Sequence, residues 1–181
     1  TQPDLLTPGS ISANQVLCIG SDPQMLTSAS SPSGGPGSYS YQWQSAVSVD
    51  GPFINISGAT SAAYLPPVRP TYTLFYRRMV TSGVCQPVYS NVVEVRVNPL
   101  PVAILSGGET ICPDESSILT INLPVGTGPF VVEIANHGTV TDYESGNDII
   151  VRPEETTTYR ITRVRDANGC TKTVPVIITQ P

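Results

Sequence analysis

One pattern of residues occurs twice in this chain. Threonines, an arginine and a cysteine recur with one spacing, as Thr71, Thr73, Arg78 and Cys85 and again as Thr156, Thr158, Arg163 and Cys170. A Val-Arg-Pro tripeptide comes just before each copy, and each copy has a second cysteine far upstream, Cys18 or Cys112. Repetition on this scale is typical of tandem modules. It favours a segment of an array over a compact enzyme.

Composition indicates the fold class. The repeat divides the 181 residues into two predicted domains, 1–98 and 99–181, each long enough for a small core. Only 13% of the residues are charged, whereas glycine and proline supply 15 and 18 residues. Such a profile is typical of short strands joined by many turns. We therefore predict an all-β chain of two tandem immunoglobulin-like sandwiches.

Charge and hydropathy exclude two classes of partner. The net charge is −5 and Lys172 is the only lysine, whereas a nucleic-acid backbone requires clustered basic residues. No apolar run has the length that crosses a bilayer, and the first residues lack the features of a signal peptide. We expect neither nucleic-acid binding nor membrane insertion of this segment. Thr-Gln-Pro at both ends suggests a piece cut from a longer array.

Alternation of apolar and polar residues places the strands. Tyr39, Tyr41 and Trp43 alternate with polar residues, so they share one strand face, and Trp43 is the expected core anchor. The second domain has Phe130, Val132 and Ile134 in the corresponding place. The predicted strands of the first domain are 11–17, 25–29, 39–44, 53–56, 63–65, 72–81 and 91–97. Those of the second are 102–105, 117–122, 130–134, 139–143, 148–151, 158–164 and 174–179. About seven strands per domain suit an immunoglobulin-like sandwich.

The four cysteines predict disulfides. They show no CxxC or histidine spacing of a zinc site. From their places along the strands we expect Cys18 to pair with Cys85 and Cys112 with Cys170, each bridge joining loops at one end of its sandwich. Disulfides would indicate an oxidising compartment outside the cytoplasm. Four buried free thiols are the alternative.

Catalytic chemistry finds little support. His137 is the only histidine and lies in a predicted turn, so a Ser-His-Asp triad is not expected. Two acidic pairs, Asp114 with Glu115 and Glu154 with Glu155, could serve a glycosidase, but adjacent acids in loops are usually solvated. We predict that the chain is not an enzyme.

Two kinds of ligand remain open. Loop oxygens at Asp148, Asp166 and Asn168 could bind calcium, although the spacing of a known calcium loop is missing and Asn168-Gly169 also suits a hairpin turn. No other cofactor is expected. The tyrosines 39, 41, 72 and 76 could form a sugar platform, but aromatic residues that alternate with polar ones normally face a core.

Several segments resemble a known family. The first domain, with Val16-Leu-Cys-Ile-Gly, Ser40-Tyr-Gln-Trp-Gln-Ser and Ser90-Asn-Val-Val, resembles the PKD-like or Ig-like repeats of giant Bacteroidetes surface proteins. The end of the second, Val164-Arg-Asp-Ala-Asn-Gly-Cys-Thr, is similar to repeats of the SprB family of gliding-motility adhesins. This resemblance implies type IX secretion and display on the outer cell surface.

The expected function is structural or adhesive. The two domains would act as a semi-rigid spacer or as a multivalent array that contacts a surface, because many weak contacts together bind firmly. The expected partners are neighbouring repeats and a surface polysaccharide or substratum. The alternative function is that of carbohydrate-binding accessory domains of a secreted enzyme.

Overall fold

The computed structural model describes residues 4–112 and 114–174. These residues form strands, turns and loops and contain no helix, so none of them belongs to a helix that could cross a membrane. The chain divides into two compact units, residues 1–97 and 98–181. The predicted all-β, sandwich class is confirmed. The division lies beside the predicted domain boundary.

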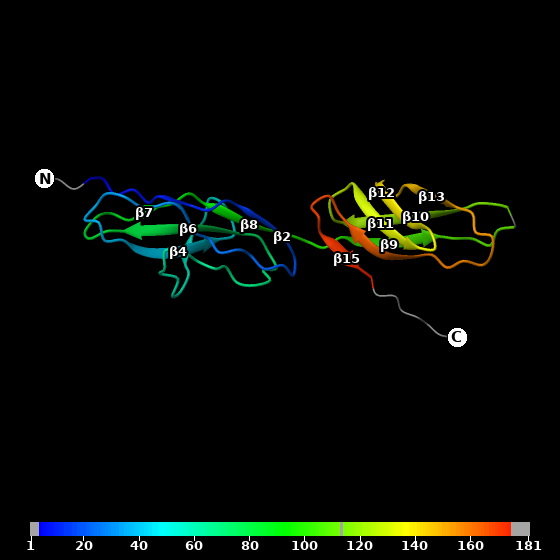
Figure 1. The fold of residues 1–181 in the computed structure, drawn as a ribbon, viewed down its shortest axis with the longest axis horizontal. Coiled ribbons are helices and arrows are strands. Elements are labelled where there is room, and N and C mark those ends of the chain that lie inside the picture. The colour runs from blue at the N-terminus through cyan, green and yellow to red at the C-terminus, as the bar shows by residue number, and fades with distance from the viewer. Residues whose placement is uncertain (1–3, 113, 175–181) are drawn as a thin grey trace. The chain divides into compact units, whose positions relative to one another are not determined.

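Unit 1 contains one large sheet and one small sheet (Figure 1). The large sheet has the order β2-β8-β6-β4-β5, with β7 also paired to β6, and the small sheet pairs β1 with β3. The strands are β1 Ser10–Ile11, β2 Gln15–Cys18, β3 Ser28–Ser30, β4 Ser40–Ala46, β5 Ile54–Asn55, β6 Leu74–Thr81, β7 Val88–Tyr89 and β8 Val93–Asn98.

The two long central strands of unit 1 build its core. In β6, every second residue from Tyr76 to Val80 is buried, as expected for a strand with one inward face. Trp43 of β4 is fully buried and donates its indole N–H to the carbonyl of Ser61 at 2.9 Å. The core cluster consists of Ile11, Leu26, Trp43, Tyr76, Val93 and Val95. Trp43 therefore lies where the sequence predicted a core anchor.

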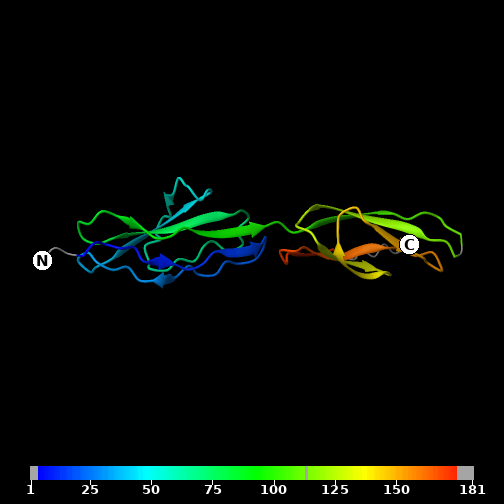
Figure 2. The ribbon, with the colours of Figure 1, turned by 90° about the horizontal axis from the view of Figure 1, so that it is seen from above.

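Unit 2 is a sandwich of a three-stranded and a four-stranded sheet, whose strand orders are β13-β10-β9 and β12-β11-β14-β15 (Figures 1 and 2). Neighbouring strands in both of these sheets are antiparallel. The strands are β9 Val102–Gly107, β10 Ser117–Val125, β11 Phe130–Ala135, β12 Gly138–Tyr143, β13 Asp148–Val151, β14 Arg160–Arg165 and β15 Thr171–Thr173.

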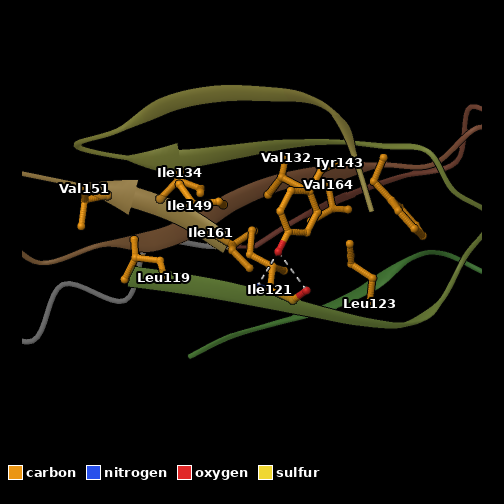
Figure 3. Packing of buried hydrophobic residues seen from close by; sticks show 11 residues of the cluster. Leu119, Ile121, Leu123, Val132, Ile134, Tyr143, Ile149, Val151, Ile161 and Val164 are labelled. Carbon is orange, nitrogen blue, oxygen red and sulfur yellow. Dashed lines mark hydrogen bonds between the residues drawn. The ribbon is translucent and has the colours of Figure 1, made fainter. Parts of the chain in front are cut away.

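Both sheets of unit 2 contribute buried side chains to one apolar core, in which the Tyr143 hydroxyl forms hydrogen bonds with the backbone of Ile121 (Figure 3). Phe130, Val132 and Ile134 of β11 all point into this core, as their alternation predicts. Tyr143 lies at the end of β12 and is 3% exposed. The backbone N–H of Ile121 donates to its hydroxyl oxygen at 2.9 Å, and the carbonyl oxygens of Ile121 and Asn147 lie within reach of the hydroxyl proton.

Replacing Tyr143 by phenylalanine is expected to lower the free energy of unfolding of unit 2 by about 1–3 kcal/mol, because a buried N–H and a buried carbonyl lose their partner. Urea denaturation followed by circular dichroism measures the change. Tyr159→Phe is the matched control, because the Tyr159 hydroxyl has no hydrogen-bond partner among the described residues. Equal losses for the two variants would refute the role given to the Tyr143 hydroxyl.

Several predicted strands are shorter than expected. Only Ile54–Asn55 form a strand within the predicted 53–56, and the predicted 63–65 is reduced to a single bridge between Leu26 and Tyr64. The predicted 11–17 is broken into β1 and β2. The last strand, β15, comes before the predicted 174–179, and residues 175–179 lie outside the described part of the chain.

Candidate functional site

A cationic side chain stacked on two aromatic rings lies on the outer face of the large sheet of unit 1. Arg77 belongs to β6, where its neighbours Tyr76 and Arg78 point into the core, so its own side chain points outward. Its guanidinium carbon lies 4.2 Å from the centre of the Phe53 ring and 4.0 Å from that of Tyr89. Both distances are in the range of favourable cation–π stacking.

Two amide side chains fix the rotation of this guanidinium. Gln44 lies opposite Arg77 on β4, and its Oε1 accepts a hydrogen bond from Arg77 Nε at 2.7 Å. The Nε2 of Gln44 donates in turn to Oδ1 of Asn55 on β5 at 2.8 Å. Gln44 is only 7% exposed, so this relay is held by packing. Phe53, Arg77, Tyr89, Gln44 and Asn55 together are called the Arg77 cluster below.

The other edge of the guanidinium carries unused donors. The Nη1 and Nη2 groups of Arg77 have no hydrogen-bond partner among the described residues, and no described carboxylate pairs with them. Two other arginines of the chain do pair with acids, Arg96 with Glu94 and Arg163 with Glu133. Chemically, the cluster presents a stacked, oriented cation with a free bidentate edge, which suits a carboxylate or another oxyanion.

The sequence pattern does not reveal this cluster. Its members come from four separate segments, and their juxtaposition depends on which strands pair. The one available signal was that Arg77 must point away from the core if its neighbours in β6 point inward. That signal identifies the side of the sheet on which Arg77 lies, but it does not identify the two aromatic rings beside it.

The predicted tyrosine platform is wrong. Tyr76 is 2% exposed and belongs to the core of unit 1, whereas Tyr72 is 60% exposed in the loop before β6. Tyr39 donates its hydroxyl to the carbonyl of Gly34, and the ring of Tyr41 faces the buried Arg78 guanidinium at 4.8 Å. The four rings therefore form no common surface, because Tyr76 is buried in the core, Tyr41 faces the buried Arg78 and Tyr72 lies in an exposed loop.

The structure does not bring the predicted calcium ligands together. Asp166 is 5% exposed, and its two carboxylate oxygens accept backbone N–H groups of Cys170 at 2.8 Å and Thr127 at 3.3 Å. Asn168 donates to the hydroxyl of Thr127, whereas Asp148 begins β13 in the other sheet. Among the described residues no group of three or more acidic, histidine or cysteine side chains could hold a metal ion. Asp166 instead closes the turn between β14 and β15.

The disulfide pairing predicted from the sequence is also wrong. Cys18 and Cys170 are disulfide-bonded, whereas Cys85 and Cys112 are free thiols. Neither predicted pair, Cys18 with Cys85 or Cys112 with Cys170, is therefore formed. The reason is the position of the two cysteines within each unit.

In unit 1 the two cysteines lie at opposite ends of β6. Cys85 follows the end of β6, beside Gly35, whose N–H donates to the carbonyl of Asp4 where the described chain begins. Cys18 ends β2, which lies beside β8, and Asp22 of the following turn accepts the N–H of Arg69 before β6. The eight residues of β6 span about 23 Å, whereas a disulfide requires Cα atoms within about 7 Å.

In unit 2 the two cysteines lie at opposite ends of β14. Cys170 is held by Asp166 in the turn after β14, and this turn bonds Thr127 beside the start of β9. Cys112 lies in the loop from β9 to β10, near residues 154–157 that precede β14. The six residues of β14 span about 17 Å. Cys85 and Cys170 thus lie at the end of the unit where its N-terminal residues begin. Cys18 and Cys112 lie at the opposite end.

Three acidic residues of unit 2 line a cavity of about 310 Å³. Glu109, Cys112, Glu154 and Glu155 line it. Glu115 accepts the backbone N–H of Cys112 at 3.0 Å, and neither Asp114 nor Glu115 lines the cavity. The exposed His137 lies in the turn between β11 and β12, as predicted, and is not among the lining residues. The cavity therefore does not combine these acids with the histidine that a triad requires.

Comparison with known proteins identifies the first unit. None of the curated proteins matches the chain significantly. One family model, described as a domain of unknown function (DUF8696), matches residues 7–99. The match spans all the strands of the large and small sheets of unit 1, and it covers about half of the chain. Through this unit, the chain belongs to the family described as a domain of unknown function, DUF8696.

Proposed function

We propose that this chain is a structural and adhesive repeat segment of a large bacterial cell-surface protein of the gliding-motility type. It would act outside the cell as a semi-rigid spacer and as part of a multivalent contact array. Two successive β-sandwich units and the similarity of the sequence to surface-protein repeats support this function. Its partners would be neighbouring repeats and an extracellular polysaccharide or substratum.

The placement of the cysteines is the observation that carries the proposal. Each unit has one cysteine at the end where the chain enters and another at the opposite end. A module built in this way can be covalently joined to the modules before and after it, whereas an isolated domain gains nothing from the arrangement. The free thiols of Cys85 and Cys112 would then bond cysteines of flanking modules. Such bridges form in oxidising compartments, which supports an extracellular location.

Oxidation of the purified chain is expected to join copies end to end. Cys112 of one copy and Cys85 of another each lose a proton and an electron to oxidised glutathione, which forms one protein disulfide and two reduced glutathione molecules. A non-reducing gel should show a ladder of multimers that collapses on reduction. The variants Cys85→Ser and Cys112→Ser should each abolish the ladder.

Mixing the two serine variants tests the direction of the joint. Each variant retains one of the two free thiols, so a mixture can form a mixed dimer or two symmetric dimers. If copies join end to end, the mixed Cys112–Cys85 dimer should form more often than random pairing of the two thiols would give. Mass spectrometry of cross-linked peptides measures the proportion of each dimer. A statistical mixture of dimers, or no dimers, would contradict the proposed array.

The Arg77 cluster favours a second candidate function, that of a carbohydrate-binding accessory region of a secreted enzyme. The partly exposed ring of Tyr89 beside an oriented cation offers an apolar surface and a polar group, which together suit a sugar. The oxidation experiment separates the two candidates, because an accessory domain has no need of directed joining between copies.

A further inference from the structure

We propose that the Arg77 cluster binds the carboxylate of a uronic-acid residue in an acidic polysaccharide. This inference rests on the proposed function as a surface-contact segment and names the chemical class that the segment contacts. Its structural basis is the oriented guanidinium on the outer face of β6, with one edge and its stacking faces already occupied by protein groups.

The geometry leaves one direction of approach for a ligand. The rings of Phe53 and Tyr89 stack on the guanidinium of Arg77, and Gln44 occupies the Nε edge. Only the Nη1 and Nη2 edge remains, and its two parallel N–H groups match the two oxygens of one carboxylate. Because the relay from Gln44 to Asn55 fixes the side chain before binding, little conformational entropy is lost when the ligand arrives.

The charge balance points to an anionic ligand. The chain has a net charge of −5, yet Arg77 pairs with no carboxylate among the described residues. The exposed Arg96 on β8 differs in this respect, since it bonds Glu94 at 3.0 Å. Arg78 has no acidic partner either, but it is fully buried and out of reach of a polymer. Arg77 is thus the oriented, unpaired cation on this face of the sheet.

The surroundings of the guanidinium favour a sugar as the carrier of the carboxylate. Tyr89 is 43% exposed and presents ring surface next to the cation, on which the apolar face of a sugar ring can stack. The Nδ2 of the exposed Asn55 has no hydrogen-bond partner among the described residues and can donate to a sugar oxygen. Tyr89 and Asn55 are both exposed on the outer side of the sheet, so the site is an open, shallow face. A shallow face suits one residue of an extended polymer.

Binding of the full chain to immobilised polymers tests the proposal. Polygalacturonate supplies the carboxylated sugar, dextran a neutral sugar, dextran sulfate a sulfated one and poly-glutamate a carboxylate without sugar. Wild-type protein should bind polygalacturonate best. Arg77→Met should weaken this binding by about tenfold or more, because a charge-assisted bidentate contact is lost. Arg77→Lys should give an intermediate loss, because it keeps the charge without the planar fork.

Arg96→Met is the matched control, because it removes an arginine that is already paired and should leave binding within about twofold of wild type. Thermal melting verifies that each variant is folded. Equal binding by wild type and Arg77→Met would overturn the site, and so would absence of binding to polygalacturonate. Stronger binding to dextran sulfate or poly-glutamate would overturn the uronic-acid assignment. The proposed array function would survive these outcomes, because it is tested by oxidation.

Discussion

Replacing Trp43 by alanine is expected to lower the free energy of unfolding of unit 1 by about 3–5 kcal/mol, the usual cost of removing a large buried aromatic side chain. Trp43 is fully buried, and its ring centre lies 5.6 Å from that of Tyr64. The truncation also leaves the carbonyl of Ser61 without its indole donor. A loss of this size is a large fraction of the stability of a small domain.

The measurement is chemical denaturation followed by far-ultraviolet circular dichroism, because Trp43 is the only tryptophan and its removal abolishes the fluorescence signal. Trp43→Phe is the control. It keeps an aromatic ring in the core and should recover much of the lost stability, with the remaining deficit reflecting the smaller ring and the missing N–H. A loss below about 1 kcal/mol for Trp43→Ala would show that Trp43 does not anchor the core.

The alternation rule succeeded where a strand is long and has one buried face. The rule placed β4, β8, β11 and β13 close to their observed bounds. In these strands most buried apolar residues alternate with more exposed residues, and this alternation is visible in the sequence. The rule failed at β5, which has only two residues, and at residues 63–65, where Tyr64 forms a single bridge with Leu26. Such segments carry too few alternating residues to reveal their course.

The predicted cysteine pairing failed because the sequence does not show at which end of a unit each strand finishes. The sequence shows that Cys18 follows an early strand and Cys85 follows β6, but it does not show that these strands end at opposite ends of unit 1. Likewise, the Arg77 cluster depends on the pairing of β6 with β4 and β7 and of β4 with β5. Information about cross-strand neighbours is non-local, so spacing along the chain could not supply it.

The repeated arginine shows how a shared sequence pattern can hide different structures. Arg78 is buried in unit 1, whereas Arg163 is exposed in unit 2 and bonds Glu133 at 2.6 Å. The register between β11 and β14 shifts between Glu133 and Ile134, so that Thr162 is an extra residue in β14. Such a bulge reverses the faces of the residues that follow it. The repeat therefore preserves the sandwich but not the environment of its arginine.

Arg78 is itself expected to cost unit 1 stability. Its Nη1 donates to the Ser28 hydroxyl and the Ala62 carbonyl, but its Nε and Nη2 have no partner among the described residues. Burial lowers the pKa of Arg78 below its usual range, and Tyr41 acts in the opposite direction. A lowered folded-state pKa means that folding disfavours the charged form. This penalty is fully present below the folded-state pKa and diminishes only as the pH rises through the range between the folded and unfolded values.

Two substitutions separate the charge of Arg78 from its packing. Arg78→Met keeps most of the aliphatic volume and removes the buried charge, so we expect a free energy of unfolding equal to that of wild type or higher by about 1–4 kcal/mol. Arg78→Ala also removes the charge but leaves a cavity beside Trp43, and it should be about 2–5 kcal/mol less stable than Arg78→Met. Urea denaturation at neutral pH measures both. If Arg78→Met were instead less stable than wild type by more than about 2 kcal/mol, stacking of the guanidinium on Tyr41 and Trp43 would outweigh its desolvation, and Arg78 would be a stabilising core residue.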